Sequence, residues 1–556
     1  MAIAEKSMNV SQPGDYKLIV EKDVAVPMRD GAIIYADVFR PDTTDKVPII
    51  MCLSIYRKDK LWVPPDDLEE EPNEYMNWES GNPLWWCPRG YAMVRVDSRG
   101  SGKSPGRSEP SSYAESLDYY DSVEWFAKRD WCSGKVGTLG ISYLAASQWR
   151  LANLNPPSLK CILPWEGRAD QYRDQIYHGG IFAIGFIGSW YLNWTAQHLL
   201  GVPRSYNPDA FNNNMMWEIM SHELDSDYWR SCSAKWDQIK VPIYSAGNWT
   251  SHSLHLRGNT EGYMSATTEH KKLRIHSGTH FHAFYSEEGR QDQLRWFDYW
   301  LKDLDTGIMD EPPVKLEIRT GGKKGRYDFR FEDDWPIPRT EWTKWYLSVD
   351  RETDGNPDSV EGQLLPNTPA QTKTVTYKTA ADGHGAGHTR LGASFQTPPM
   401  EQATELTGPL MLNAWISSTT EDADIILTLR NIGPDGKDVW EVGAQGGPTM
   451  LTKGWLRASQ RKLDPDKTLP YRPYHPHDEY QWLKPGEPVE CQVEIWPTSI
   501  VLQKGHRLRL DVQPVDGVGT GIYTHFNNDY KFEAENTVYV GGDKPSYLLV
   551  PIIPPK

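Results

Sequence analysis

The first 311 residues contain apolar runs of strand length in which apolar and polar positions do not alternate. These runs lie at residues 47–56, 91–100, 135–142, 159–167, 241–248 and 272–278. Such runs are typical of strands buried on both faces of a sheet. Segments of helical character accompany them, at residues 117–131, 143–153 and 289–307. The succession of strands and helices predicts an α/β fold, a mostly parallel sheet covered by helices.

Residues 168–238 interrupt this succession. They contain HGGIFAIGFIGSWYLNW and MMWEIMSHELDSDYW, which are helical in character and rich in aromatic residues. The simplest interpretation is a helical cap inserted over the sheet, and a longer crossover connection is the alternative. The core would then have two segments, residues 1–167 and 239–311.

Residues 312–556 have a different pattern, with short strands of alternating polarity separated by turn-rich pieces. Examples are PLMLNAWIS, DIILTLRNIG, VECQVEIWP and HRLRLDVQP. This pattern predicts an antiparallel β-sandwich.

Composition and charge argue against several classes of partner. The chain has 556 residues, too many for one core, and a formal net charge of -16. An acidic surface repels nucleic acid and anionic membrane, so neither is expected as a partner. We find no apolar run long enough to span a membrane and no secretory leader. The six cysteines form no C-x-x-C pair, which favours a reducing, cytoplasmic location. A small-molecule substrate is expected, and a homodimer remains open.

The first candidate for chemistry is Ser142, in the stretch KVGTLGISYLAASQW. It lies where a predicted strand ends and a helix begins. A G-x-S-x-G turn holds its serine on a strained elbow above the sheet, and the small residues permit a close approach of strand and helix. Gly140 supplies the first glycine, but Leu144 replaces the last. Many serines at such turns only cap the helix, so the motif by itself leaves both roles open.

Two further motifs raise the significance of Ser142. Residues 97–106, DSRGSGKSPG, match D-x-R-G-x-G-x-S-x-G at every fixed position, and Tyr56-Arg57-Lys58 follows an early strand. With G-x-S-Y at Ser142, these motifs resemble those of the CocE/NonD group of α/β-hydrolases, which includes cocaine esterase, X-Pro dipeptidyl peptidases and α-amino acid ester hydrolases. The resemblance extends over nearly the whole chain.

The resemblance implies an α/β-hydrolase core, an inserted helical cap and a C-terminal β-sandwich of jelly-roll type. It implies that Ser142 is the nucleophile, while the Tyr56 hydroxyl and the backbone N–H of Tyr143 stabilise the oxyanion. Such donors are needed because attack on a carbonyl concentrates negative charge on its oxygen. A core tyrosine with a satisfied hydroxyl is the structural alternative for Tyr56.

The base is expected after the last predicted strand of the core, in KLRIHSGTHFHAFY. Spacing in one branch of the family favours His276, and the pattern of other branches favours His280. We take His276 as the base and His280 as the alternative. These two histidines and His282, with His252 or His255, could also ligate zinc. No H-E-x-x-H occurs, and alternate side chains of an extended segment point to opposite faces, so no metal is expected.

The acid is where the chain departs from the family pattern. The family has Trp-x-Asp after the preceding strand; here Trp249 matches, but Ser251 stands at the aspartate position. The preferred explanation is that Glu166, at another strand end, replaces it. Alternatively, Ser251 or a water orients the histidine, or hydrolysis has been lost. Glu166 could also serve only as an ion-pair partner of Arg168 or Arg173.

The sequence therefore predicts a serine hydrolase that cleaves an ester or amide of a small to medium substrate through an acyl-enzyme. No cofactor is implied. The alternatives are a biosynthetic enzyme that catalyses acyl transfer, cyclisation or elimination, and an inactive binding protein. The following residues are expected to line the pocket: Trp165, Trp190, Trp194, Trp249 and Ser251.

Overall fold

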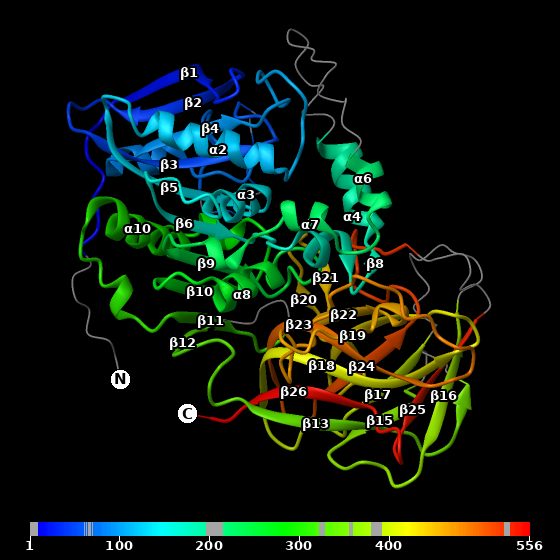
Figure 1. The fold of residues 1–556 in the computed structure, drawn as a ribbon. Helices are drawn as coiled ribbons and strands as arrows, with labels where there is room; N and C mark the ends of the chain where they lie inside the picture. The colour runs from blue at the N-terminus through cyan, green and yellow to red at the C-terminus, as the bar shows by residue number, and fades with distance from the viewer. Residues whose placement is uncertain are drawn as a thin grey trace.

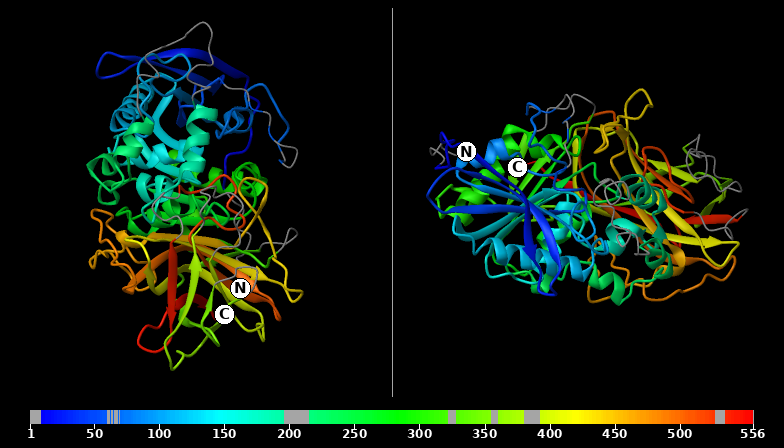
Figure 2. Two further views of the ribbon diagram at one scale, coloured as in Figure 1. Left: turned by 90° about the vertical axis from the view of Figure 1, so that its right-hand side faces the viewer. Right: turned by 90° about the horizontal axis from the view of Figure 1, so that it is seen from above.

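The structure, a computed structural model, describes most of the chain. The described residues are 9–59, 62, 64, 68, 70–195, 215–321, 328–354, 360–379, 392–526 and 534–555. Figure 1 shows two bodies, an α/β part formed by the N-terminal half and an all-β part formed by the C-terminal half. Figure 2 shows the same two bodies from the side and from above.

The α/β part is built on a ten-stranded sheet with the order β1-β2-β4-β3-β5-β6-β9-β10-β11-β12. Its strands are β1 (Leu18–Pro27), β2 (Ile33–Pro41), β3 (Val47–Ser54), β4 (Ala92–Asp97), β5 (Cys132–Ile141), β6 (Leu159–Trp165), β9 (Ile243–Asn248), β10 (Lys271–His276), β11 (Val314–Ile318) and β12 (Asp328–Glu332). Neighbouring strands from β4 to β11 are parallel, and the pairs at both edges are antiparallel. The six apolar runs of the sequence thus form the six central strands, β3, β4, β5, β6, β9 and β10.

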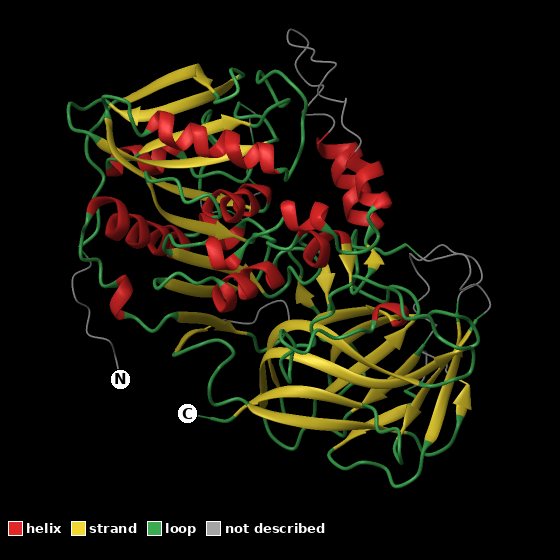
Figure 3. Ribbon diagram, in the orientation of Figure 1, coloured by secondary structure: helices red, strands yellow, loops and turns green. Residues whose placement is uncertain are grey.

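Helices cover both faces of this sheet (Figure 3). They are α1 (Pro83–Trp86), η1 (Cys87–Arg89), α2 (Tyr113–Phe126), α3 (Tyr143–Ala152), α8 (Leu256–Ser265), α9 (His282–Tyr285), α10 (Glu287–Lys302) and η6 (Ile308–Asp310). Helices α2 and α3 bury Tyr119, Phe126 and Trp149 in one cluster, whereas α1 and α10 bury Trp86 and Trp296 in another. The sheet is therefore buried on both sides, which is why its strands lack alternation.

Residues 168–238, the segment predicted as an insertion, form a series of short elements between β6 and β9. Its described elements are η2 (Tyr172–Ile176), β7 (Tyr177–His178), β8 (Ile181–Phe182), α4 (Ile184–Gly188), η3 (Ser189–Thr195), α6 (Met215–Ser221), α7 (Asp227–Ser231) and η5 (Trp236–Gln238). An aromatic cluster that includes Tyr172, Tyr177 and Trp229 packs them together. The insertion is mostly short helices, as expected, but it also contains the two-stranded hairpin β7–β8.

The predicted domain boundary at residues 311 and 312 needs a correction. Strands β11 and β12 were expected to belong to the β-sandwich, yet β11 pairs with β10 and β12 with β11, so both extend the ten-stranded sheet. By pairing with the edge of β10, β11 provides hydrogen-bond partners for backbone N–H and C=O groups that would be unpaired in a shorter sheet.

The C-terminal part is all-β, as predicted. Its strands are β13 (Glu341–Ser348), β14 (Thr353–Asp354), β15 (Gly362–Leu365), β16 (Lys373–Lys378), β17 (Ala393–Gln396), β18 (Thr404–Ser418), β19 (Asp424–Ile432), β20 (Glu441–Val442), β21 (Pro448–Thr449), β22 (Thr452–Arg457), β23 (Val489–Leu502), β24 (Arg507–Gln513), β25 (Glu535–Val540) and β26 (Tyr547–Ile553), with η7 (Ala458–Gln460). All but β20 and β21 lie in one mostly antiparallel, 12-stranded sheet. The sheet closes because β26 at its end also pairs with β18, giving a barrel-like shape. The jelly-roll topology remains a prediction.

The insertion and the C-terminal part contact each other through the hairpin β7–β8. The amide of Arg457 donates to the carbonyl of Gly179 at 2.8 Å. The ring of His178 stacks on Trp455, with the ring centroids 4.7 Å apart. A Cβ at Gly179 would lie 2.0 Å from the Trp455 carbonyl oxygen, so only glycine permits this approach. The contact holds the C-terminal part against the edge of the α/β part.

Candidate active site

Ser142 occupies a strained turn between β5 and α3. Its backbone has φ 57° and ψ -113°, outside the region that most residues adopt. The turn is tight, since a Cβ at Gly140 would lie 2.5 Å from the Cβ of Leu144. This explains why the first glycine of the motif is kept. Leu144 can replace the last glycine because its side chain packs in a cluster with Ile55 and Tyr143.

Donors for an oxyanion lie beside this serine. The buried hydroxyl of Tyr56 lines the same pocket, and it accepts a hydrogen bond of 2.8 Å from Nε1 of Trp190. In this hydrogen bond Trp190 is the donor and the Tyr56 oxygen is the acceptor, so the bond does not use the phenolic proton. The N–H of Tyr143 belongs to the first turn of α3, where amides have no acceptor within the helix. The Tyr143 side chain points elsewhere and donates to Glu115 at 2.7 Å.

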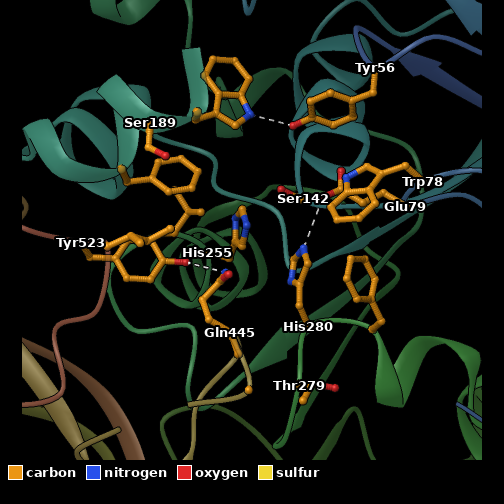
Figure 4. A pocket seen from close by; sticks show the side chains of 17 residues that line it. Tyr56, Trp78, Glu79, Ser142, Ser189, His255, Thr279, His280, Gln445 and Tyr523 are labelled. Carbon is orange, nitrogen blue, oxygen red and sulfur yellow. Dashed lines mark hydrogen bonds and ion pairs between the residues drawn. The ribbon is translucent and has the colours of Figure 1, made fainter. Parts of the chain in front are cut away.

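The geometry distinguishes between the two candidate bases. His280 lies in the pocket with Ser142 (Figure 4). Its Nδ1 is 2.8 Å from Oε2 of Glu166. His276, the residue that the sequence analysis preferred, is buried behind the pocket and does not line it. Its Nε2 is 3.7 Å from Oε1 of Glu166 and has no hydrogen-bond partner. The geometry therefore favours the alternative, His280, over the preferred His276, because the last residue of β10 packs in the core beside Trp165.

Glu166 directly follows β6 and is completely buried. Its backbone has φ 49°, and its amide donates to the carbonyl of Ala246 at 2.6 Å. The side-chain amide of Asn248 donates to Oε1 of Glu166 at 3.1 Å and so fixes the carboxylate. Arg168 and Arg173, the ion-pair partners considered for Glu166, bond instead to other groups, Gln171 and Asp170 among them.

Ser251 stands in the loop after β9 where an aspartate was expected. It is buried, its Oγ has no hydrogen-bond partner, and it does not line the pocket. The alternative in which Ser251 orients the histidine therefore has no support from this geometry. The carboxylate beside His280 comes from the end of β6 instead.

A second carboxylate, that of Glu79, lies on the other side of His280. Its Oε1 is 3.4 Å from Nε2 of His280, and Glu79 lines the same pocket as Ser142. Glu79 is buried, has φ 58°, and its carbonyl accepts a hydrogen bond of 3.0 Å from the amide of Ile141. Three non-glycine residues with positive φ, Glu79, Ser142 and Glu166, thus meet at one site. Strained backbone of this kind concentrates at functional sites.

The electrostatics of the site follow from these contacts. Burial by itself would lower the pKa of His280, but the charge and hydrogen bond of Glu166, together with Glu79, raise it to about 10. Burial raises the pKa of Glu79, and the hydrogen bond from His280 opposes this only in part. In contrast, burial lowers the pKa of His276 to about 4, which keeps that ring neutral. The two neighbouring carboxylates therefore favour the charged form of His280.

The pocket has a volume of about 550 Å³ and is mostly apolar. The α/β part contributes Tyr56, Trp78, Glu79, Ser142, Leu254, His255, Thr279, His280 and Phe281; the insertion contributes Phe186, Ser189 and Trp190; the C-terminal part contributes Ala444, Gln445, Gly446, Ile522 and Tyr523. Figure 4 shows side chains from all three parts around one space.

Of the five residues expected to line the pocket, the structure places one there, Trp190. Trp165 and Trp249 are fully buried in the cores instead. They belong to the packing of the sheet rather than to the pocket. The side chain of Trp194 lies outside the described residues.

The sequence analysis did not identify Glu79 or the pocket-lining residues of the C-terminal part. Glu79 lies in a loop between β3 and α1 that has no periodic pattern. Its one local signal is the aromatic cluster that surrounds it, WESGNPLWW. Gln445 and Tyr523 come from two loops about 80 residues apart in a region that appeared to be scaffold. Nothing local in the sequence links these loops to Ser142.

Within the described ranges, no three histidine, cysteine or acidic side chains are grouped as metal ligands would be. Across the same parts of the chain, every helix is too short or too polar to cross a bilayer.

Comparison with known proteins gives matches over almost the full length. Residues 30–282 match the profile of the X-Pro dipeptidyl-peptidase (S15) family, and residues 306–549 match that of the X-Pro dipeptidyl-peptidase C-terminal non-catalytic domain. The cocaine esterase of Rhodococcus sp. (strain MB1 Bresler) is 23% identical over 97% of this chain and 99% of its own. A putative Xaa-Pro dipeptidyl-peptidase of Bacillus anthracis is 25% identical over 88% of this chain and 81% of its own.

Solved structures agree with these matches. A CocE/NonD family hydrolase from Staphylococcus aureus superposes with a TM-score of 0.86 at 30% identity, over 98% of this chain and 96% of that one. An α-amino acid ester hydrolase superposes with a TM-score of 0.70 at 16% identity, over 100% of this chain and 99% of that one. The latter shows a common fold alone.

Proposed function

The chain belongs to the CocE/NonD family of hydrolases, and from this we propose that it is a serine hydrolase that cleaves an ester or amide through an acyl-enzyme. Ser142 is the nucleophile, His280 the base and Glu166 the acid of the triad. The observation that carries the proposal is that a strained serine and a histidine line one pocket, and that Nδ1 of this histidine is 2.8 Å from a buried carboxylate. Relatives that are esterases and peptidases support it.

In acylation, His280 Nε2 takes the proton of Ser142 Oγ while Oγ bonds to the carbonyl carbon of the substrate. The Glu166 carboxylate accepts a hydrogen bond from Nδ1–H of His280 and stabilises the imidazolium that results. The Tyr56 hydroxyl and the Tyr143 amide donate to the oxyanion. The imidazolium then gives its proton to the leaving group, and water cleaves the acyl-enzyme by the same steps in reverse.

The pocket supports a substrate of small to medium size with an apolar acyl group. Its volume of about 550 Å³ suits a ligand of that size, and aromatic side chains from the insertion and the C-terminal part, Trp190 and Tyr523 among them, enclose it.

The test is labelling with a fluorophosphonate probe followed by mass spectrometry of the labelled peptide. We expect one modified serine, Ser142, and no labelling of Ser142→Ala. A folded wild-type protein that is neither labelled nor able to hydrolyse short-chain aryl esters would overturn the proposal and favour the non-hydrolytic or binding alternatives.

A further inference from the structure

We propose that Glu79 is a further catalytic residue of the hydrolase proposed above, on which this inference rests: its carboxylate takes the Nε2 proton of His280 and so converts that ring into a base for Ser142.

The starting observation is that both ring nitrogens of His280 face carboxylates. Nδ1 is 2.8 Å from Glu166, and Nε2 is 3.4 Å from Glu79. A ring that donates from both nitrogens is an imidazolium, and a neutral ring can donate from one nitrogen alone. An imidazolium has no lone pair with which to accept the proton of Ser142. The free site therefore needs a proton acceptor before attack can begin.

Glu79 is the acceptor within reach. The Nε2–H bond breaks, the proton passes to Oε1 of Glu79, and Nε2 keeps the electron pair. The site then holds neutral His280 and protonated Glu79, and its net charge is unchanged because the proton moved within the pair. The freed Nε2 accepts the Ser142 proton as Oγ bonds to the carbonyl carbon, as in a conventional triad.

The same transfer removes an electrostatic obstacle. An ionised Glu79 beside Ser142 would repel the negative charge that develops on the substrate carbonyl oxygen. A protonated Glu79 is neutral. An apolar acyl group that fills the pocket displaces water and disfavours the charged carboxylate, so substrate binding itself drives the transfer.

The backbone around Glu79 holds it for this role. Its carbonyl accepts from the amide of Ile141, which directly precedes Ser142. A Cβ at Gly140 would lie 3.3 Å from the Glu79 carbonyl oxygen, so the two segments are in close contact. These contacts hold Glu79 in its unfavourable backbone conformation, with φ 58°. A carboxylate needed only as a counter-ion for His280 would be redundant, because Glu166 already pairs with that ring.

Other ionisable groups surround the pair. Around His280 lie Glu166, His276 and His255, whose ring is stacked 5.6 Å from that of His280. Around Glu79 lie Ser142, Trp78, Tyr56 and Tyr285. Arg168 interacts with Tyr56 and His255, and Tyr523 with Glu166. Of these, Glu79 alone among the carboxylates contacts Nε2 of His280 in the described part of the chain.

The experiment compares the pH dependence of kcat/KM for aryl ester hydrolysis in the wild type, Glu79→Gln and Glu79→Asp. In the wild type the proton stays within the pair, so kcat/KM is expected to be flat from about pH 6 to about pH 9. In Glu79→Gln the proton must leave to solvent, and kcat/KM should rise about tenfold per pH unit below the pKa of His280. Glu79→Asp keeps the acceptor and should restore the flat profile at a lower level.

The matched control is Glu317→Gln. Glu317 is also a buried carboxyl near this loop and accepts from the amide of Ser277 at 2.7 Å, but it does not line the pocket. The control should keep the wild-type profile. If Glu79→Gln lowers kcat/KM by the same factor at every pH, Glu79 is structural and the inference is wrong. If the wild type shows neither labelling of Ser142 nor turnover, the proposed function fails and this inference with it.

A second measurement observes the protonation of His280 directly in the wild type. Histidine-selective NMR of the wild type, with His280 assigned by its loss in His280→Gln, should show a ring protonated on both nitrogens at pH 7. A neutral His280 ring at that pH in the free enzyme would overturn the inference.

Discussion

Nδ1 of His280 lies 2.8 Å from Oε2 of Glu166, two residues separated by 114 positions in the chain. They meet because parallel strands β6, β9 and β10 are neighbours, so the loops at their carboxyl ends share one edge of the sheet. The carboxylate that contacts His280 therefore comes from the loop after β6, whereas Ser251, in the loop after β9, does not line the pocket.

The first prediction separates the two histidines. His280→Gln should abolish ester hydrolysis, because among the described residues His280 is the imidazole that both lines the pocket and hydrogen-bonds to Glu166. His276→Gln should keep most of the activity, since its ring does not line the pocket. The measurement is kcat/KM for both variants at pH 8. Loss of activity in His276→Gln with full activity in His280→Gln would restore the original preference.

The second prediction concerns the acid. Glu166→Gln should lower kcat about 10³–10⁴-fold, because an amide cannot stabilise the imidazolium and can hold the wrong tautomer. Asn248→Ala should have a smaller effect, since Asn248 only orients the carboxylate through a bond of 3.1 Å. Single-turnover kinetics of acyl-enzyme formation measure both variants. An unchanged acylation rate in Glu166→Gln would contradict the assignment.

The third prediction tests the oxyanion donor. Tyr56→Phe should lower kcat about 10²–10³-fold while KM changes little, because a donor to the oxyanion stabilises the transition state more than the bound substrate. Trp190→Phe should lower kcat about tenfold, since it removes one hydrogen bond that directs the Tyr56 hydroxyl. Steady-state measurement of kcat and KM with one aryl ester distinguishes a role in transition-state stabilisation from a role in substrate binding. An increase in KM alone, for either variant, would assign these residues to substrate binding.

The fourth prediction concerns stability in acid. Burial lowers the pKa of His276 to about 4, below the value of about 6.5 in the unfolded chain. The unfolded state therefore binds the proton first, so stability is complete above pH 6.5 and falls as the pH drops from 6.5 towards 4. The loss from this residue approaches about 3 kcal/mol.

His276→Gln should accordingly make Tm less dependent on pH between 6.5 and 4. The control is His282→Gln, which replaces an exposed histidine on α9 and should leave the slope unchanged. Tm measured by calorimetry at half-unit steps of pH provides the comparison. Equal slopes for the wild type and His276→Gln would show that this ring is not held neutral in the folded protein.

The sequence by itself was enough to locate the central strands and to identify the kinds of residue that could carry out the chemistry. Unbroken apolar runs marked the six central strands because both faces of those strands are buried, and local motifs marked Ser142 and Tyr56 because an elbow and a strand end are built from neighbouring residues. The length and aromatic content of residues 168–238 were likewise enough to mark an insertion.

The tertiary structure decided how those residues combine. The choice between His276 and His280 depends on where a strand stops, since one residue points into the core and the other into the pocket, and spacing does not fix that point. Glu79, Gln445 and Tyr523 reach the site from loops that only the packing of three parts brings together. The sequence shows which side chains are able to act as nucleophile, base or acid. Which of them lie close together depends on the order of the strands in the sheet and on the contacts between the three parts.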